Sequence, residues 1–196
     1  MVRQRMEQRN LGDQYLCPAL PASPSAAVQS VLALTQCVPA SELAIIGSSL
    51  GGYYATWIAE KLHCRAVLLN PAIDPAADLQ AHIGRQPVYF SAEQIDFRPE
   101  YIDELRELST VVTRPERYFL IAATGDTVID YRTMIEKYRG ARQRVIEGSN
   151  HELSDFEMYI EEVFSFCGVG APRRGSSQSN SVRGMESGGN EVREIQ

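Results

Sequence analysis

Hydrophobic and polar positions follow two alternating patterns up to about residue 167. Apolar runs typical of buried strands occur at 42–46, 66–70 and 117–122, and shorter strands are expected at 14–17 and 143–146. Segments with apolar residues at helical spacing occur at 2–9, 24–37, 50–62, 130–138 and 153–166. Strands that alternate with helices predict an α/β fold, a mostly parallel sheet with helices on both faces. Ligands of such sheets bind outside the carboxyl ends of the strands.

The segment 71–114 departs from this alternation. It holds several prolines and short helical stretches, the clearest at 99–108, and no obvious strand. One interpretation is a small helical cap insertion over a pocket on the ligand side of the sheet. The other is an ordinary helical crossover that has become longer. Both stay open at this point.

The last segment, 168–196, is rich in glycine and serine and contains no aromatic residue. Such a composition buries too little apolar surface to offset the entropy lost on ordering. We therefore expect one folded domain at 1–167, with the insertion at about 71–114, and a disordered tail at 168–196.

Charge and composition exclude several classes of protein. There are 25 acidic against 19 basic residues, a formal net charge of −6, and no basic cluster longer than Arg173-Arg174, which argues against a nucleic-acid partner. No apolar run approaches the roughly 20 residues of a membrane span, and the N-terminus lacks a secretion-signal pattern. The cysteines are widely spaced, which favours reduced thiols in a cytoplasmic protein over a zinc site: Cys17, Cys37, Cys64 and Cys167. The oligomeric state stays open.

The turn at 47–51 reads Gly-Ser-Ser-Leu-Gly and fits the pattern G-x-S-x-G between a strand and a helix. In this context the turn lifts the central Ser49 above the sheet, and side chains at Gly47 or Gly51 would collide with it. The N–H of Leu50, at the start of the helix, would face the same point as an oxyanion donor. The alternative is a Gly/Ser turn whose serine only caps the helix.

A nucleophilic serine needs an imidazole base and a carboxylate, which in this arrangement follow it in the order Asp, His. Of three histidines, His63 ends the helix after the serine and His82 lies in the insertion, whereas His151 follows a strand on the ligand side. The acid is expected after the strand at 117–122. Asp126 is preferred there, and its competitor Asp130 has the position of a helix N-cap.

These residues resemble one known family. The stretch 45–57, Asn70-Pro71-Ala72, Thr124-Gly125-Asp126 with Asp130-Tyr131-Arg132, and 145–148 followed by Asn150-His151 are similar to the YqiA-like esterases, small bacterial α/β-hydrolases. The resemblance implies a serine esterase acting on carboxylic esters or acyl thioesters, with Ser49, Asp126 and His151 as its triad. It implies no metal and no other cofactor, and it identifies no physiological substrate.

One departure from that family concerns the start of the chain. Its members begin with a strand and a His-Gly loop that supplies the second oxyanion N–H, whereas this sequence starts inside the following helix and contains no Leu-His-Gly-Phe. We therefore expect a gap in the sheet between the strands at 14–17 and 42–46. Either the chain is incomplete, or its first strands have been reorganised.

Two other functions remain open at this point. The first is an inactive hydrolase-fold protein, because of the absent oxyanion loop, and the second is an acyltransferase on the same scaffold. Several side chains either shape an acyl pocket or only pack in the core: Tyr53, Asn70, Tyr89, Phe90 and Phe97.

Overall fold

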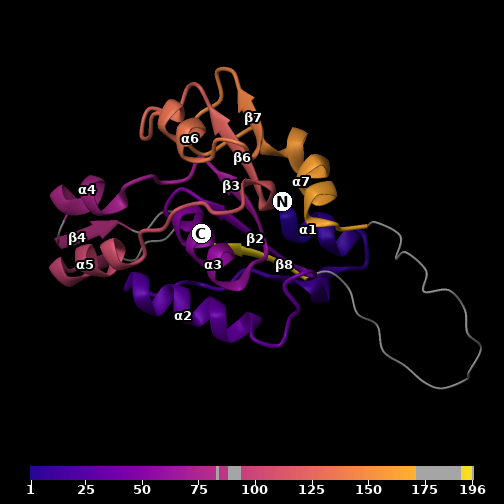
Figure 1. Ribbon diagram of the computed structural model, residues 1–196, viewed down its shortest axis with the longest axis horizontal. Coiled ribbons are helices and arrows are strands. Elements are labelled where there is room, and N and C mark those ends of the chain that lie inside the picture. Colours follow the sequence, from indigo (N-terminus) through magenta and orange to yellow (C-terminus); the bar gives the residue numbers. More distant parts are fainter. Residues whose placement is uncertain (83, 88–93, 171–190, 196) are drawn as a thin grey trace, which may run out of the picture.

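A six-stranded, fully parallel sheet forms the centre of the protein in this computed structural model, which describes residues 1–82, 84–87, 94–170 and 191–195 (Figure 1). The strand order is β1-β8-β2-β3-β6-β7. The strands are β1 (Tyr15–Leu16), β2 (Leu43–Ser48), β3 (Arg65–Leu69), β6 (Tyr118–Ala123), β7 (Arg142–Ile146) and β8 (Glu191–Ile195). The structure thus confirms the fold class expected from the alternating pattern.

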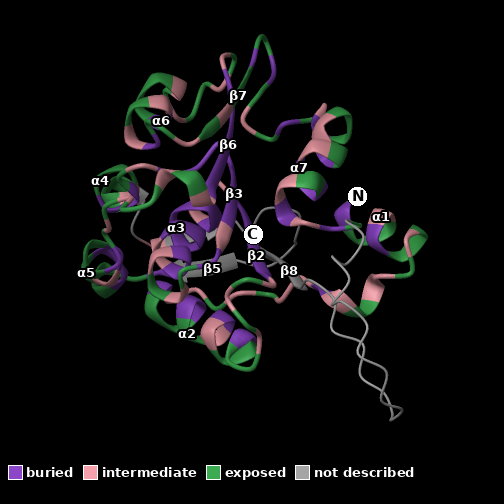
Figure 2. Ribbon diagram, turned by 45° about the vertical axis from the view of Figure 1, so that its right-hand side comes forward, coloured by how far each residue is buried: buried purple, intermediate pink, exposed green. Residues whose placement is uncertain are grey.

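Helices cover both faces of the sheet (Figure 2). One face packs against α1 (Val2–Gln8) and α7 (Ile160–Cys167), and the other against α2 (Pro24–Thr35) and α3 (Leu50–Leu62). The strand side chains alternate accordingly, since Ala44 and Ile46 face the first pair of helices and Leu43 and Ile45 the second. Outside the insertion, the described residues also form α6 (Tyr131–Lys137) and the short 3-10 helices Gly12–Gln14, Pro115–Arg117 and Phe156–Tyr159.

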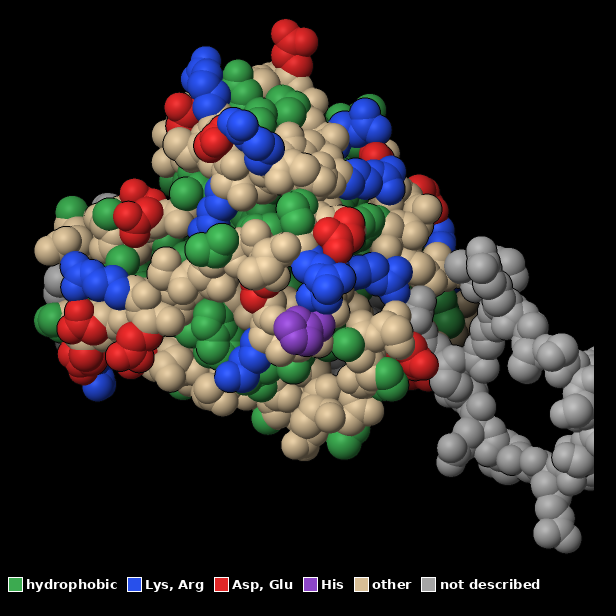
Figure 3. Space-filling model, viewed as in Figure 1, with side chains coloured by type: hydrophobic (Ala, Val, Ile, Leu, Met, Phe, Trp, Pro, Cys, Tyr) green, Lys and Arg blue, Asp and Glu red, His purple; other side chains and the backbone are tan. Residues whose placement is uncertain are grey.

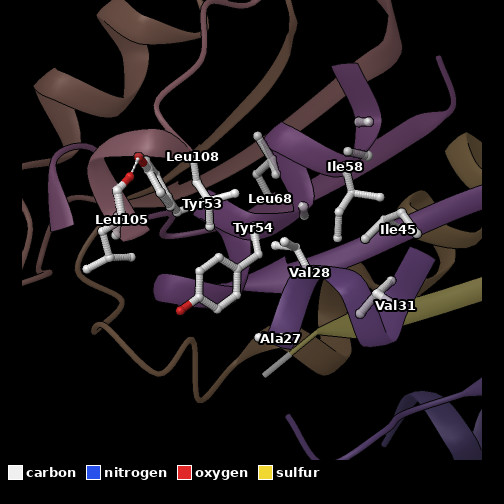
Figure 4. Packing of buried hydrophobic residues seen from close by; sticks show 14 of the residues in the cluster. Ala27, Val28, Val31, Ile45, Tyr53, Tyr54, Ile58, Leu68, Leu105 and Leu108 are labelled. Atoms are coloured by element: carbon white, nitrogen blue, oxygen red, sulfur yellow. Dashed lines mark hydrogen bonds between the residues drawn. The ribbon is translucent and has the colours of Figure 1, made fainter. Parts of the chain in front are cut away.

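The middle strands are buried on both faces because helices cover them on each side. Every residue of β6 is buried, and so is every residue of β2 except Ser48. This explains why these strands read as continuous apolar runs in the sequence. Figure 4 shows the larger core cluster, in which side chains of α2 and α3 meet strand residues such as Ile45 and Leu68.

The insertion between β3 and β6 contains α4 (Pro75–Leu79), a 3-10 helix (Gln80–His82), β4 (Gly84–Pro87), β5 (Gln94–Phe97) and α5 (Pro99–Glu107). The expected helices are present, but the expectation that the insertion holds no strand is wrong, because β4 and β5 form an antiparallel pair. Their few residues, among them Pro87, carry no clear alternation that would have revealed a strand pair. The Tyr53 hydroxyl, on the first turn of α3, donates to the carbonyl oxygen of Leu105 at 2.7 Å and so links the insertion to the serine turn (Figure 4).

The C-terminal residues differ from the expected disordered tail in two places. Val169 is buried, and Glu191–Ile195 forms β8, which lies beside β2 in Figure 1. β8 pairs in parallel with both β1 and β2, so it occupies the position where the sequence suggested a gap. The backbone N–H and C=O groups of β1 and β2 that a gap would leave unpaired therefore have hydrogen-bond partners in β8. The rest of the expected tail, 171–190 and 196, lies outside the described residues.

The surface carries charges of both signs. On the face shown in Figure 3, basic and acidic side chains are intermingled over the helices and strands. Within the described ranges, none of the helices has the length and apolar character needed to cross a bilayer.

Candidate active site

The serine turn joins the carboxyl end of β2 to α3. Ser49 occupies the N-cap position of α3 with φ 52° and ψ −121°, a positive-φ conformation that non-glycine residues rarely adopt. Its N–H donates to the carbonyl oxygen of Leu69 at 3.0 Å, and its own carbonyl oxygen accepts from the N–H of Ala72 at 2.9 Å. The backbone at the end of β3 and just after it therefore holds the strained turn in place.

Two glycines allow the backbone of this turn to approach its surroundings closely. A Cβ atom on Gly47 would lie 2.2 Å from the carbonyl oxygen of Gly51, and one on Gly52 would lie 2.7 Å from Cβ of Pro71. The steric requirement predicted at Gly47 is therefore present. A similar one applies to Gly52, where the helix passes the segment that follows β3.

The structure brings together the serine, the histidine and the first of the two candidate carboxylates. Nε2 of His151 lies 3.0 Å from Oγ of Ser49, and Nδ1 of His151 lies 2.7 Å from Oδ2 of Asp126. The Asp126 side chain has no exposed surface, whereas 18% of the His151 side chain remains exposed. A hydroxyl, an imidazole and a buried carboxylate thus form one hydrogen-bonded series.

The two candidate acids have different surroundings. Oδ1 of Asp126 accepts the N–H groups of Val128 at 2.8 Å and of Ile129 at 2.9 Å, which leaves Oδ2 directed at the histidine. Asp130 caps α6 by accepting the N–H of Arg132 at 2.9 Å. The two amide donors to Asp126 were not anticipated, because turn amides give no signal in the sequence.

The acid loop and the base loop are joined by hydrogen bonds. The N–H of Thr124 donates to the carbonyl oxygen of Ile146 at 2.9 Å, and the N–H of Gly148 donates to the Thr124 hydroxyl at 2.9 Å. A Cβ on Gly125 would lie 2.6 Å from the carbonyl oxygen of Ser149. Glycine at 125 thus permits this close approach of the two loops.

The other residues considered from the sequence lie elsewhere or serve packing. His63 ends α3 in a left-handed conformation, with Nδ1 3.2 Å from a guanidinium nitrogen of Arg117. Phe97 is buried in an edge-to-face contact with Tyr101, their ring centroids 5.6 Å apart. Tyr89, Phe90 and the His82 side chain lie outside the described residues.

A lysine ammonium lies over a tyrosine ring of the first turn of α3. The ammonium group of Lys137 donates to the carbonyl oxygen of Ile73 at 3.3 Å and lies 5.3 Å from the centroid of the Tyr53 ring. Burial lowers the pKa of Lys137 and raises the pKa of Tyr53. The phenol is therefore neutral at physiological pH, and its hydroxyl acts as a hydrogen-bond donor to the insertion.

Asn70 has more contacts than the sequence suggested. Its side-chain amide is fully buried and bonds to backbone atoms of Ala123, Asn150 and His151. No group of histidine, cysteine and carboxylate side chains suited to a metal ion occurs among the residues that the structure describes.

Comparison with known proteins places this geometry in a family. The family model described as "Uncharacterised protein family (UPF0227)" matches residues 1–168. The chain belongs to UPF0227. This is the family of YqiA-like esterases that the sequence resembles. The match includes Ser49, Asp126 and His151 and ends at the carboxyl end of α7.

Solved structures similar to this UPF0227 member share the α/β-hydrolase fold. A protein from Agrobacterium vitis S4, described as a candidate hydrolase, has a TM-score of 0.57 and 19% sequence identity, with 74% of this chain and 68% of that chain covered. Mouse alpha/beta hydrolase domain-containing protein 10 has a TM-score of 0.52 and 16% identity, with coverages of 74% and 70%. An esterase domain from Rhodothermus marinus has a TM-score of 0.51 and 16% identity, with coverages of 76% and 69%.

Proposed function

We propose that this protein is a serine hydrolase that cleaves carboxylic esters or acyl thioesters of small molecules. One observation carries the proposal: the imidazole of His151 lies within hydrogen-bond distance of both the Ser49 hydroxyl and the buried Asp126 carboxylate. The fold and the strained conformation of Ser49 at a strand-to-helix turn support it. The widely spaced free cysteines support a cytoplasmic location.

In the proposed reaction, Ser49 Oγ attacks the acyl carbon while His151 Nε2 accepts the hydroxyl proton. Asp126 accepts the Nδ1–H of His151, fixes the tautomer and stabilises the imidazolium that forms. The imidazolium then gives its proton to the leaving alcohol or thiol, which leaves an acyl-enzyme. Water, activated by the same histidine, hydrolyses the acyl-enzyme and restores the serine.

Negative charge develops on the acyl oxygen during both steps. Leu50 is the first residue of α3, and the first N–H of a helix has no acceptor within the helix. We assign the Leu50 N–H as an oxyanion donor, where the positive end of the helix also favours the charge. One such donor contributes about 2.7–4 kcal/mol of transition-state stabilisation.

The experiment is hydrolysis of p-nitrophenyl acetate, butyrate and octanoate and of an acyl-coenzyme A thioester by the purified full chain. Ser49→Ala should reduce the rate to the background, whereas Ser48→Ala, at the end of β2, should retain it. No turnover by the wild-type chain, or equal rates for the wild type and Ser49→Ala, would support an inactive hydrolase-fold protein. An ester product formed with an added alcohol would instead support an acyltransferase.

A further inference from the structure

We propose that Asn70 is a positioning residue of the candidate active site, whose side-chain amide holds the base loop against the strand that leads to the acid. The inference rests on the proposed function, because it assumes that Ser49, His151 and Asp126 act together. It concerns the placement of the base.

Asn70 is rigidly held at the carboxyl end of β3. Its side chain is fully buried, and its φ of 41° lies in the left-handed region that asparagine tolerates better than most residues. Its N–H donates to the carbonyl oxygen of Ile121 in β6 at 3.0 Å. The backbone at Asn70 therefore holds the side-chain amide in a fixed position.

The amide group uses both of its donors and its acceptor on backbone atoms. Nδ2 donates to the carbonyl oxygens of Asn150 and His151, each at 3.0 Å, and Oδ1 accepts the N–H of Ala123 at 2.8 Å. The amide has one compatible orientation, because the carbonyl oxygens require the NH₂ group and the N–H requires the oxygen. Two successive carbonyls of the base loop thus converge on a single NH₂ group.

These contacts link the three parts of the site. Ala123 is the last residue of β6, and the acid loop begins directly after it. On either side of Asn70, Leu69 and Ala72 form the hydrogen bonds that hold the backbone of Ser49. The backbone around Asn70 therefore holds the nucleophile. The Asn70 side chain holds both the strand that leads to the acid and the loop that carries the base.

An amide is the group that this position requires. A carboxylate of the same shape would still accept the Ala123 N–H, but its second oxygen would face the carbonyl oxygens of Asn150 and His151, where no donor remains. We expect the base loop to move away from this repulsive contact. The Nε2–Oγ distance of 3.0 Å would lengthen with it, and a displacement of about 1 Å at a reacting group costs up to about 100-fold in rate.

The test compares Asn70→Asp with the wild type in two measurements. Steady-state kinetics with p-nitrophenyl butyrate should show kcat reduced by about 10- to 100-fold with KM within about twofold. Proton NMR should show loss or a large shift of the downfield resonance from the proton between His151 Nδ1 and Asp126 Oδ2. The NMR measurement does not depend on turnover.

A matched control separates positioning from stability. Tyr138→Phe removes a different buried hydrogen bond, the 2.7 Å contact with Thr56, and should retain both kcat and the downfield resonance. If Asn70→Asp does not fold, the same measurements are made on Asn70→Gly. Glycine adopts the left-handed backbone conformation readily and removes the side-chain amide.

The proposal is overturned if the folded Asn70 variant keeps kcat within twofold and keeps the resonance. It is also overturned if Tyr138→Phe, at an equal loss of stability, loses kcat to the same degree. A third outcome separates the two proposals. If the wild-type chain hydrolyses no ester but shows the resonance, and the Asn70 variant loses the resonance, the proposed function is contradicted and the positioning role is supported.

Discussion

Nε2 of His151 lies 3.0 Å from Oγ of Ser49, although 102 positions separate the two residues in the sequence. The carboxyl ends of parallel strands meet at one edge of the sheet, and both residues lie on connections that leave this edge. The proposed chemistry depends on this contact and on the Asp126 carboxylate, which bonds to the other ring nitrogen of His151.

The first prediction distinguishes the two carboxylates. Asp126→Asn should reduce kcat for p-nitrophenyl esters by about 10³- to 10⁴-fold, because the amide cannot stabilise the imidazolium and favours the wrong tautomer. Asp130→Asn should leave kcat unchanged, since asparagine caps a helix as well as aspartate does. Equal losses in the two variants would contradict the assignment of Asp126.

The second prediction concerns the serine turn. Gly47→Ala should lower the free energy of unfolding by more than about 3 kcal/mol, because the new Cβ would lie 2.2 Å from a backbone oxygen that cannot move without breaking the turn. Gly12→Ala is the control, with a nearest contact of 3.2 Å to the flexible Glu7 side chain and an expected change below about 1 kcal/mol. Urea unfolding of both variants measures the difference, and equal stabilities would refute the steric account.

Much of the fold could be predicted from the sequence because it depends on local patterns. The middle strands are buried on both faces and therefore read as apolar runs, as at Tyr118–Ala123. The serine turn combines two flanking glycines with a strand before and a helix after it, a pattern typical of the nucleophile turn of α/β-hydrolases. The candidate base followed from its place after a strand, since His63 ends a helix and His82 lies in the insertion.

The remaining features depend on contacts between distant residues. β8 has three charged residues among its five, so nothing in its composition indicates a strand between β1 and β2. Asn70 reads as an ordinary turn residue, and only the folded chain brings its amide to Asn150 and His151. The preference for Asp126 over Asp130 rests on its place in a loop directly after a strand, whereas the 2.7 Å distance from its Oδ2 to Nδ1 of His151 arises only in the folded chain.

The third prediction concerns β8. Removing residues 171–196 should lower the free energy of unfolding by about 3 kcal/mol or more, since several ladder hydrogen bonds with β1 and β2 are lost at about 0.5–1.5 kcal/mol each. The exposed strand edges should also promote association, which light scattering would detect.

A point substitution in β8 serves as a matched test of the same strand. Val192→Pro removes a backbone N–H and should destabilise the full chain, whereas Val192→Thr retains the N–H and a β-branched side chain. Unchanged stability in both the shortened chain and Val192→Pro would mean that β8 does not complete the sheet.

The fourth prediction is a loss of stability at alkaline pH. Burial raises the pKa of the Cys64 and Cys167 thiols to about 12, whereas in the unfolded chain they ionise near about 8.5. Between these values the unfolded chain binds fewer protons, so the free energy of unfolding should fall by about 1.4 kcal/mol per pH unit for each thiol. Below pH 8 their contribution should be constant.

Urea unfolding between pH 8 and 10 would measure this slope. Cys167→Ala should reduce the slope, and Cys37→Ala, which removes an exposed thiol, should leave it unchanged. A slope that is the same in all three proteins would show that the buried thiols do not cause the pH dependence.

The most direct test of the central claim is covalent labelling of the intact chain with a fluorophosphonate, followed by peptide mass spectrometry. The account predicts one adduct per molecule, on Ser49, formed at a rate that falls by at least about 10³-fold in His151→Ala and is unchanged in Ser48→Ala. An unlabelled wild-type chain, an adduct on another residue, or equal labelling of His151→Ala would contradict it.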